Sequence, residues 1–179
     1  MKKSSKLSLC GMMCALSVVF MFLTGVFPYA TYALPALAGL TLIVLVVEIS
    51  KRWAVVAYLA ISLISLLIAP DRTAVLLFIV FFGYYPILKS VIETRCKRVA
   101  EWVWKILVFN AAVGISYGFM QLFVSTEDLL VFFGKYGIWG ILFGIVFLNI
   151  VFVIYDIAVS RIITAYIHWF RPRYLRKLR

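Results

Sequence analysis

The side chains that could recognise a solute lie where apolar segments of this chain meet short polar loops. They combine aromatic rings with a few hydroxyl, amide and charged groups, which is the usual composition of a small-molecule pocket. The candidate solute-binding residues are Tyr29, Thr31, Tyr32, Asp71, Arg72, Tyr117 and Gln121. Anchoring at a membrane interface and turn formation explain the same residue types, so both interpretations stay open.

Bond-breaking chemistry is not indicated anywhere in the sequence. No segment matches the phosphate-binding GxxxxGK[ST] pattern, the HExxH zinc helix or the GxSxG nucleophile motif. The single histidine, His168, lies in a basic tail, and Cys10 and Cys14 have no other cysteine or histidine near them in sequence. We therefore expect no enzymatic activity, no cofactor and no resident metal ion.

The composition indicates a membrane protein. The chain has 179 residues, of which 65% are hydrophobic and only 14% are charged. A soluble domain of this size could not bury so much apolar surface, whereas helices in a bilayer expose it to lipid. We expect an all-α membrane protein with a single integral membrane domain, residues 1–179.

The apolar segments predict a six-transmembrane helix bundle, because about 20 helical residues cross a hydrocarbon core of about 30 Å. In residues 88–105, apolar positions recur at intervals of three and four among charges, which predicts an amphipathic interfacial helix between spans four and five. Gly83 and Pro86 predict a kink in span four. The expected spans are 7–27, 35–49, 53–69, 73–88, 106–123 and 136–158, followed by a basic C-terminal tail, 159–179.

The distribution of basic residues gives the orientation. Of the 18 lysines and arginines, all except Arg72 and Lys135 fall on the side that holds both termini. Cytoplasmic loops carry such an excess, so we expect both termini in the cytoplasm and the chain in the cell membrane. The net charge of +11 then indicates contact with anionic lipid headgroups on the cytoplasmic face, and we expect no binding of nucleic acid.

Two features of the predicted spans bear on function. Ser8, Gly11 and Ala15 share one face of span one, and such small residues allow close helix packing in lipid, either within the chain or with a partner. Tyr117 and Gln121 lie within about two turns of the outer end of span five, where polar groups can meet a solute. We expect a pocket there, covered by the loop of Tyr29, Thr31 and Tyr32, with Asn110 as a packing residue.

The layout resembles the substrate-binding S component of energy-coupling factor (ECF) transporters. The likeness rests on six spans with both ends inside, the length, the segment Gly11-Met12-Met13-Cys14-Ala15 and a first outer loop with proline. The family motif is usually Ala-xxx-Ala, and Gly11 departs from it in identity but not in small size. The resemblance implies that Ser8, Gly11 and Ala15 dock on a transmembrane coupling subunit driven by ATPase subunits. It also implies a solute such as a vitamin or another micronutrient.

Two alternatives remain from the sequence. A structural or assembly membrane protein, similar in size to cell-shape proteins of the MreD type, would need no solute pocket, and Tyr117 and Gln121 would then bond neighbouring helices. A membrane enzyme acting on lipid would need a charged or nucleophilic cluster at the interface, and we find no such cluster in the sequence.

Overall fold

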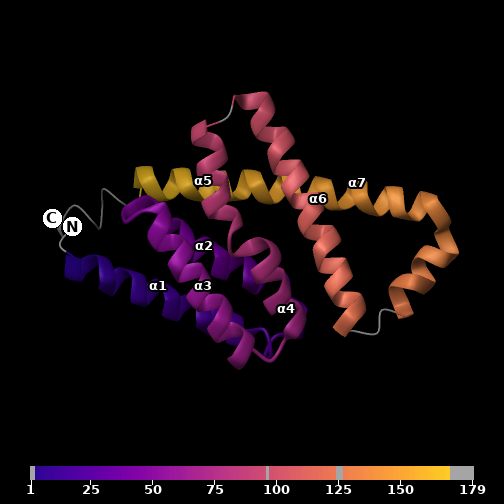
Figure 1. Cartoon of the computed structure of the whole chain (residues 1–179), viewed down its shortest axis with the longest axis horizontal. Coiled ribbons are helices and arrows are strands. Elements are labelled where there is room, and N and C mark those ends of the chain that lie inside the picture. Colours follow the sequence, from indigo (N-terminus) through magenta and orange to yellow (C-terminus); the bar gives the residue numbers. More distant parts are fainter. Residues whose placement is uncertain (1–2, 96, 124–126, 170–179) are drawn as a thin grey trace. The chain divides into compact units, whose positions relative to one another are not determined.

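The computed structural model describes residues 3–95, 97–123 and 127–169. Within these ranges, residues 28, 120–123, 127–138 and 141 are described by their backbone only. The described elements are all helical, as expected (Figure 1). The chain forms two compact units, Met1–Lys105 and Ile106–Arg179, which we call the first and second units.

The first unit contains most of the helices. They are α1 (Lys3–Leu23), the 3₁₀ turn η1 (Pro28–Ala30), α2 (Ala33–Glu48), α3 (Lys51–Ile68), α4 (Arg72–Leu77), the π-helical turn η2 (Phe78–Phe82) and α5 (Tyr85–Arg95). Helix α6 (Arg98–Phe123) begins in the first unit and continues into the second, which also contains α7 (Glu127–Ala165).

Five helical segments are long and apolar enough to cross a membrane. They are Lys3–Leu23, Lys51–Ile68, Arg72–Arg95, Arg98–Phe119 and Leu142–Trp169. A multi-pass helical membrane protein is thus confirmed. The remaining predicted span, 35–49, corresponds to α2, which has 16 residues and so reaches about 24 Å, short of a full hydrocarbon core. Six crossings therefore stay a prediction.

The boundaries of the first and last spans differ from the predicted ones. Helix α1 begins at Lys3 and ends at Leu23, where span one was expected to run to Phe27. It ends in a turn that lies against Pro70, since a Cβ atom on Gly25 would come within 2.4 Å of the proline ring. Helix α7 begins at Glu127, well before the predicted start of span six. Its 39 residues exceed the length needed for one crossing.

The predicted amphipathic helix over 88–105 is wrong, because the structure divides this segment between α5 and α6. Glu93 Oε1 lies 3.0 Å from Lys89 Nζ and 2.9 Å from Lys105 Nζ. In one continuous helix, positions 93 and 105 would stand about 18 Å apart, so this pairing requires the chain to fold back between Arg95 and Arg98. Four charged residues of this segment, Lys89, Glu93, Glu101 and Lys105, thus pair with one another.

Both lysines of this network are buried. Lys89 and Lys105 are each 1% exposed, and Lys105 Nζ also lies 2.6 Å from Glu101 Oε1 and 5.6 Å from the centre of the Trp102 ring. A buried ammonium group is stable only with such close acceptors. The network therefore fixes the hairpin of α5 and α6 at the end of the first unit.

Glu93→Gln is expected to lower the free energy of unfolding by about 2 kcal/mol, because it removes the carboxylate that two buried lysines share. Thermal unfolding in detergent checks this result. Arg95→Gln is the matched control, since Arg95 is exposed in the same helical turn and should unfold like the unaltered protein. Equal unfolding temperatures for the two variants would contradict a stabilising role of the network.

The predicted interruption of span four is confirmed. The amide of Gly83 donates to the carbonyl of Phe78 over 2.8 Å, a π-type bond, and the regular helix resumes only at Tyr85. Pro86 has no N–H to donate to the carbonyl of Phe82, which is why the α-helical pattern cannot continue through this point. The Tyr58 hydroxyl donates to the carbonyl of Ile79 over 2.7 Å and so braces the distorted turn.

Close approach of backbones organises the core of the first unit. A Cβ atom on Gly39 of α2 would lie 2.2 Å from the carbonyl oxygen of Phe82, so α2 packs directly on the interrupted turn. Helix α1 packs on α2 through Ser17, whose hydroxyl donates to the carbonyl of Ala38 over 3.1 Å and also bonds the Thr41 hydroxyl. Alanines and branched side chains fill the rest, including Leu42, Ala57, Ile61 and Phe78.

Candidate functional site

The small residues of α1 form an exposed face. Ser8, Gly11 and Ala15 are all exposed, and a Cβ atom on Gly11 would meet no atom of the described residues within 4 Å. The opposite face of α1 is buried through Cys10, Ser17 and Met21. These three small residues therefore do not serve packing within the first unit. We call Ser8, Gly11 and Ala15 the small face.

The loop between α1 and α2, predicted to be the first outer loop, and the turn before α4 lie side by side in the first unit. The contact is made by Gly25 and Pro70, which are close enough that no side chain could replace the glycine hydrogen. Tyr29 and Tyr32 of this loop are exposed, and Thr31 is half-buried. This end of the unit thus presents aromatic rings to the surroundings, as the sequence predicted for a solute-binding or interface-anchoring loop.

Asp71 and Arg72 have structural contacts that sequence reasoning did not assign. The Asp71 carboxylate accepts hydrogen bonds from the amides of Thr73 and Ala74 at 2.9 and 3.2 Å, which caps the N-terminus of α4. Arg72 donates to the carbonyl of Leu66 in the last turn of α3, where carbonyl groups lack intrahelical partners. Asp in front of a helical segment is a known capping signal, so the role of Asp71 was accessible from the sequence.

Tyr117 and Gln121 belong to the part of α6 in the second unit. Tyr117 is half-buried, whereas the side chain of Gln121 falls outside the described residues. The predicted pocket between these residues and the first outer loop stays a prediction.

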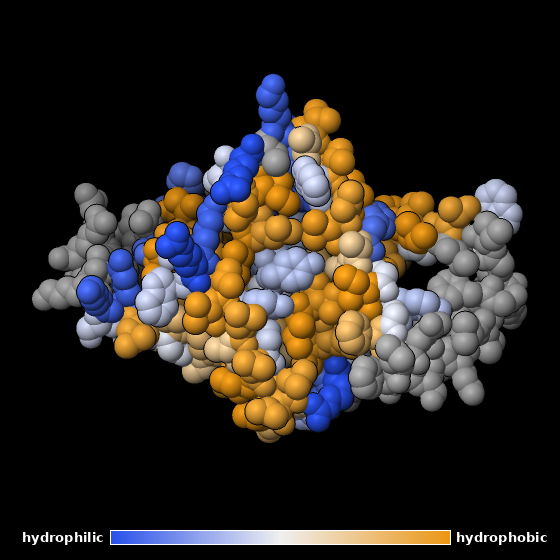
Figure 2. Space-filling view, viewed as in Figure 1, coloured by the Kyte–Doolittle hydropathy of each residue, from blue (hydrophilic) through white to orange (hydrophobic). Residues whose placement is uncertain are grey.

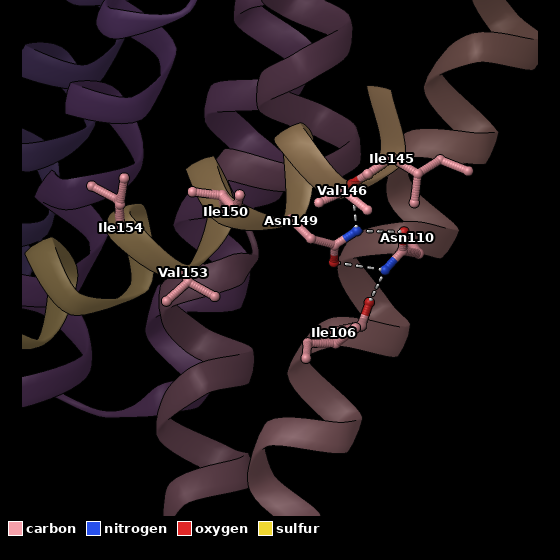
Figure 3. A pocket seen from close by; sticks show the side chains of 8 residues that line it. All are labelled: Ile106, Asn110, Ile145, Val146, Asn149, Ile150, Val153 and Ile154. Carbon is pink, nitrogen blue, oxygen red and sulfur yellow. Dashed lines mark hydrogen bonds between the residues drawn. The ribbon is translucent and has the colours of Figure 1, made fainter. Parts of the chain in front are cut away.

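The second unit contains a shallow groove of about 530 Å³ between α6 and α7 (Figure 3). Branched aliphatic side chains form most of its walls, and Asn110 and Asn149 are its polar members. The lining residues are Ile106, Asn110, Ile145, Val146, Asn149, Ile150, Val153 and Ile154. Asn149 was not singled out from the sequence, although an amide inside an apolar run is the signal that identifies such a residue.

The two asparagines bond each other reciprocally (Figure 3). Asn110 Nδ2 donates to Asn149 Oδ1 over 3.0 Å, and Asn149 Nδ2 donates to Asn110 Oδ1 over 3.2 Å. Each amide also donates to the carbonyl four residues earlier in its own helix, Ile106 or Ile145, over 2.8 Å. All four N–H bonds of the pair are thereby used, so the groove offers no amide donor for recognising a polar solute. Asn110 is a helix-pairing residue.

Replacing Asn110 by leucine is expected to weaken the pairing of α6 with α7 by about 1 kcal/mol, the usual size of a side-chain hydrogen bond between membrane helices. A double-mutant cycle with Asn149→Leu, read by thermal unfolding in detergent, measures the coupling. The double variant should be no less stable than either single variant, because it leaves no amide without its partner. Strictly additive effects would show that the two amides act independently.

In the described part of the chain, no group of three or more histidine, cysteine, aspartate or glutamate residues is arranged to hold a metal ion. Comparison of the chain with protein-family models, with curated proteins and with solved structures finds no match.

Proposed function

We propose that this chain is a membrane-embedded solute-binding subunit, similar to the S component of ECF transporters, that takes part in ATP-driven uptake. The observation that supports this function best is the small face of α1. Ser8, Gly11 and Ala15 lie together on the outside of the first unit, and in the part of the chain that the structure describes nothing within 4 Å would obstruct a Cβ atom on Gly11. Such a row of small residues permits a second helix to approach closely, whereas contact with lipid alone does not require small side chains.

The side chains available indicate which steps of uptake this chain would carry out and which its partners would. This chain would bind the solute, a vitamin or another micronutrient, at its outer end, and a transmembrane coupling subunit with attached ATPases would supply the energy. Tyr29, Thr31 and Tyr32 of the first outer loop are the proposed contacts in the first unit, and Tyr117 and Gln121 those in the second. Asp71 and Arg72 are weaker candidates, because the Asp71 carboxylate caps α4 and Arg72 bonds the end of α3.

Mass spectrometry of the full chain, purified from its own membranes, tests solute binding. We expect one small organic molecule per chain, retained through purification and reduced in amount by Tyr32→Ala and by Tyr117→Ala. Leu7→Ala is the control, since Leu7 is exposed near the start of α1, at the opposite end of that helix from the loop of Tyr32, and its loss should leave retention unchanged. A chain that retains no molecule, and binds none from a panel of vitamins and cofactors, would contradict the proposal.

A structural or assembly role is the second candidate, and the Asn110–Asn149 pair favours it. There, polar groups of membrane helices satisfy each other and leave no donor for a solute, as expected of a protein whose task is to hold helices together. Uptake measurements separate the two functions, because deletion of a structural protein should not abolish the entry of one specific solute.

A further inference from the structure

At the corner between α5 and α6, the acidic side chains are paired with buried lysines and the remaining basic side chains are exposed. The acidic side chains of this region, Glu93 and Glu101, point to the buried ammonium groups of Lys89 and Lys105. The basic side chains of Arg95, Lys97 and Arg98, at the tip of the hairpin, are exposed. We call these last three residues the basic corner. Hydrophilic side chains project at this corner in Figure 2.

The charge of the basic corner is not compensated by nearby acids. Within the described residues, the salt bridges of this region occupy Glu93 and Glu101 with lysines, and none is found for Arg95, Lys97 or Arg98. Lys51 adds to the positive charge near the basic corner, because its ammonium group donates to Ser90 O and Thr94 Oγ1 over 3.0 and 3.1 Å. These bonds hold the start of α3, where Arg52 is exposed, against the last turns of α5.

Apolar side chains follow directly after the basic corner on α6. Val99 and Val103 are exposed one turn apart, and Trp104 is also exposed beside them. A tryptophan at the end of a membrane helix typically lies at headgroup level, with its ring against the upper part of the acyl chains. The corner therefore presents cations and, within two helical turns, an apolar surface.

We propose that the basic corner binds the phosphate of an anionic phospholipid of the cytoplasmic leaflet, with the acyl chains of that lipid along Val99 and Val103. A phospholipid joins a negative phosphate to an apolar tail and so complements both parts of this surface, whereas an acidic soluble protein would complement only the cations. The positive-inside distribution places the corner on the side where anionic headgroups attract basic residues. The site does not depend on solute binding and is compatible with either candidate function.

Native mass spectrometry of the full chain, released from nanodiscs of phosphatidylglycerol mixed with phosphatidylcholine, tests this site. The unaltered protein should retain phosphatidylglycerol preferentially. Substituting glutamine at all three positions, Arg95→Gln, Lys97→Gln and Arg98→Gln, should reduce its retention on the order of tenfold. The matched control substitutes glutamine for Lys3, Lys6 and Arg161, which removes the same charge from positions outside the basic corner and should have a much smaller effect.

Four outcomes would overturn the proposal. Equal losses of lipid in the two triple variants would show a general effect of net charge. Unchanged retention of lipid in the corner variant would show that the basic corner does not bind lipid and would favour a protein partner there. Complete displacement of the lipid by millimolar inorganic phosphate would show that the corner binds free phosphate. Circular dichroism and size-exclusion elution establish that both variants are folded, and a smaller lipid loss in the correctly folded corner variant than in the control also counts against the site.

Discussion

Gly39→Ala is expected to prevent stable folding of the first unit or to lower its free energy of unfolding by more than about 3 kcal/mol. The added methyl group would lie 2.2 Å from the carbonyl oxygen of Phe82 and 2.9 Å from its carbon. These are backbone atoms of an interrupted helix, so they cannot rotate away as a side chain would. Helix α2 would have to separate from the turn formed by η2.

Thermal unfolding in detergent measures this effect, with Gly11→Ala as the matched control. Both positions are glycines within apolar helices, but among the described residues a Cβ atom on Gly11 meets nothing within 4 Å. The control should be as stable as the unaltered protein, or slightly more so because alanine favours the helix. If the two variants unfolded at the same temperature, the close contact of α2 with Phe82 would not be a determinant of the fold.

Gly11→Trp is expected to abolish solute uptake in cells while leaving folding and solute binding intact. The indole would project from the small face, where no atom of the described residues lies within 4 Å of a Cβ atom on Gly11, but it would separate the backbones of two docked helices. Uptake of the solute identified by mass spectrometry gives the readout, and thermal unfolding establishes that the variant is folded.

Ala60→Trp is the matched control for this experiment. Ala60 is an exposed small residue of α3, so its replacement adds the same bulk to a different outward face of the first unit. Uptake should persist in this variant. Loss of folding in Gly11→Trp would show that the small face packs inside the protein, and persistence of uptake in both variants would exclude the small face as the docking surface.

Local signals in the sequence were sufficient for much of the fold. Long runs of apolar residues, suited to a bilayer, predicted most of the helices. Gly83 and Pro86 predicted the interruption between α4 and α5, because the missing N–H of a proline removes a hydrogen bond from the helix that contains it. The exposure of Gly11 and Ala15, in contrast, could not be predicted from local signals. Small residues suit contacts within the chain and contacts with a partner equally well, so only the packing of α1 on α2 decides which face turns outward.

The α5–α6 corner was mispredicted because its determinant is a long-range contact. The apolar positions of residues 88–105 repeat with the same period in a surface helix and in two arms of a hairpin. The pairing of Glu93 with Lys105 distinguishes the two, and it brings together residues that are far apart along any single helix. The Asn110–Asn149 pair was equally inaccessible, because nothing in the sequence indicates which polar residues of different spans meet.

A photo-crosslinking amino acid at Ala15, activated in growing cells, tests the proposed function most directly. We predict an adduct between this position and one integral membrane protein that purifies together with ATPase subunits. The same crosslinker at Ala60 of α3, also exposed, should give no such adduct. Adducts from Ala15 that stay within the chain, or that join it to a membrane protein without ATPase partners, would contradict the account.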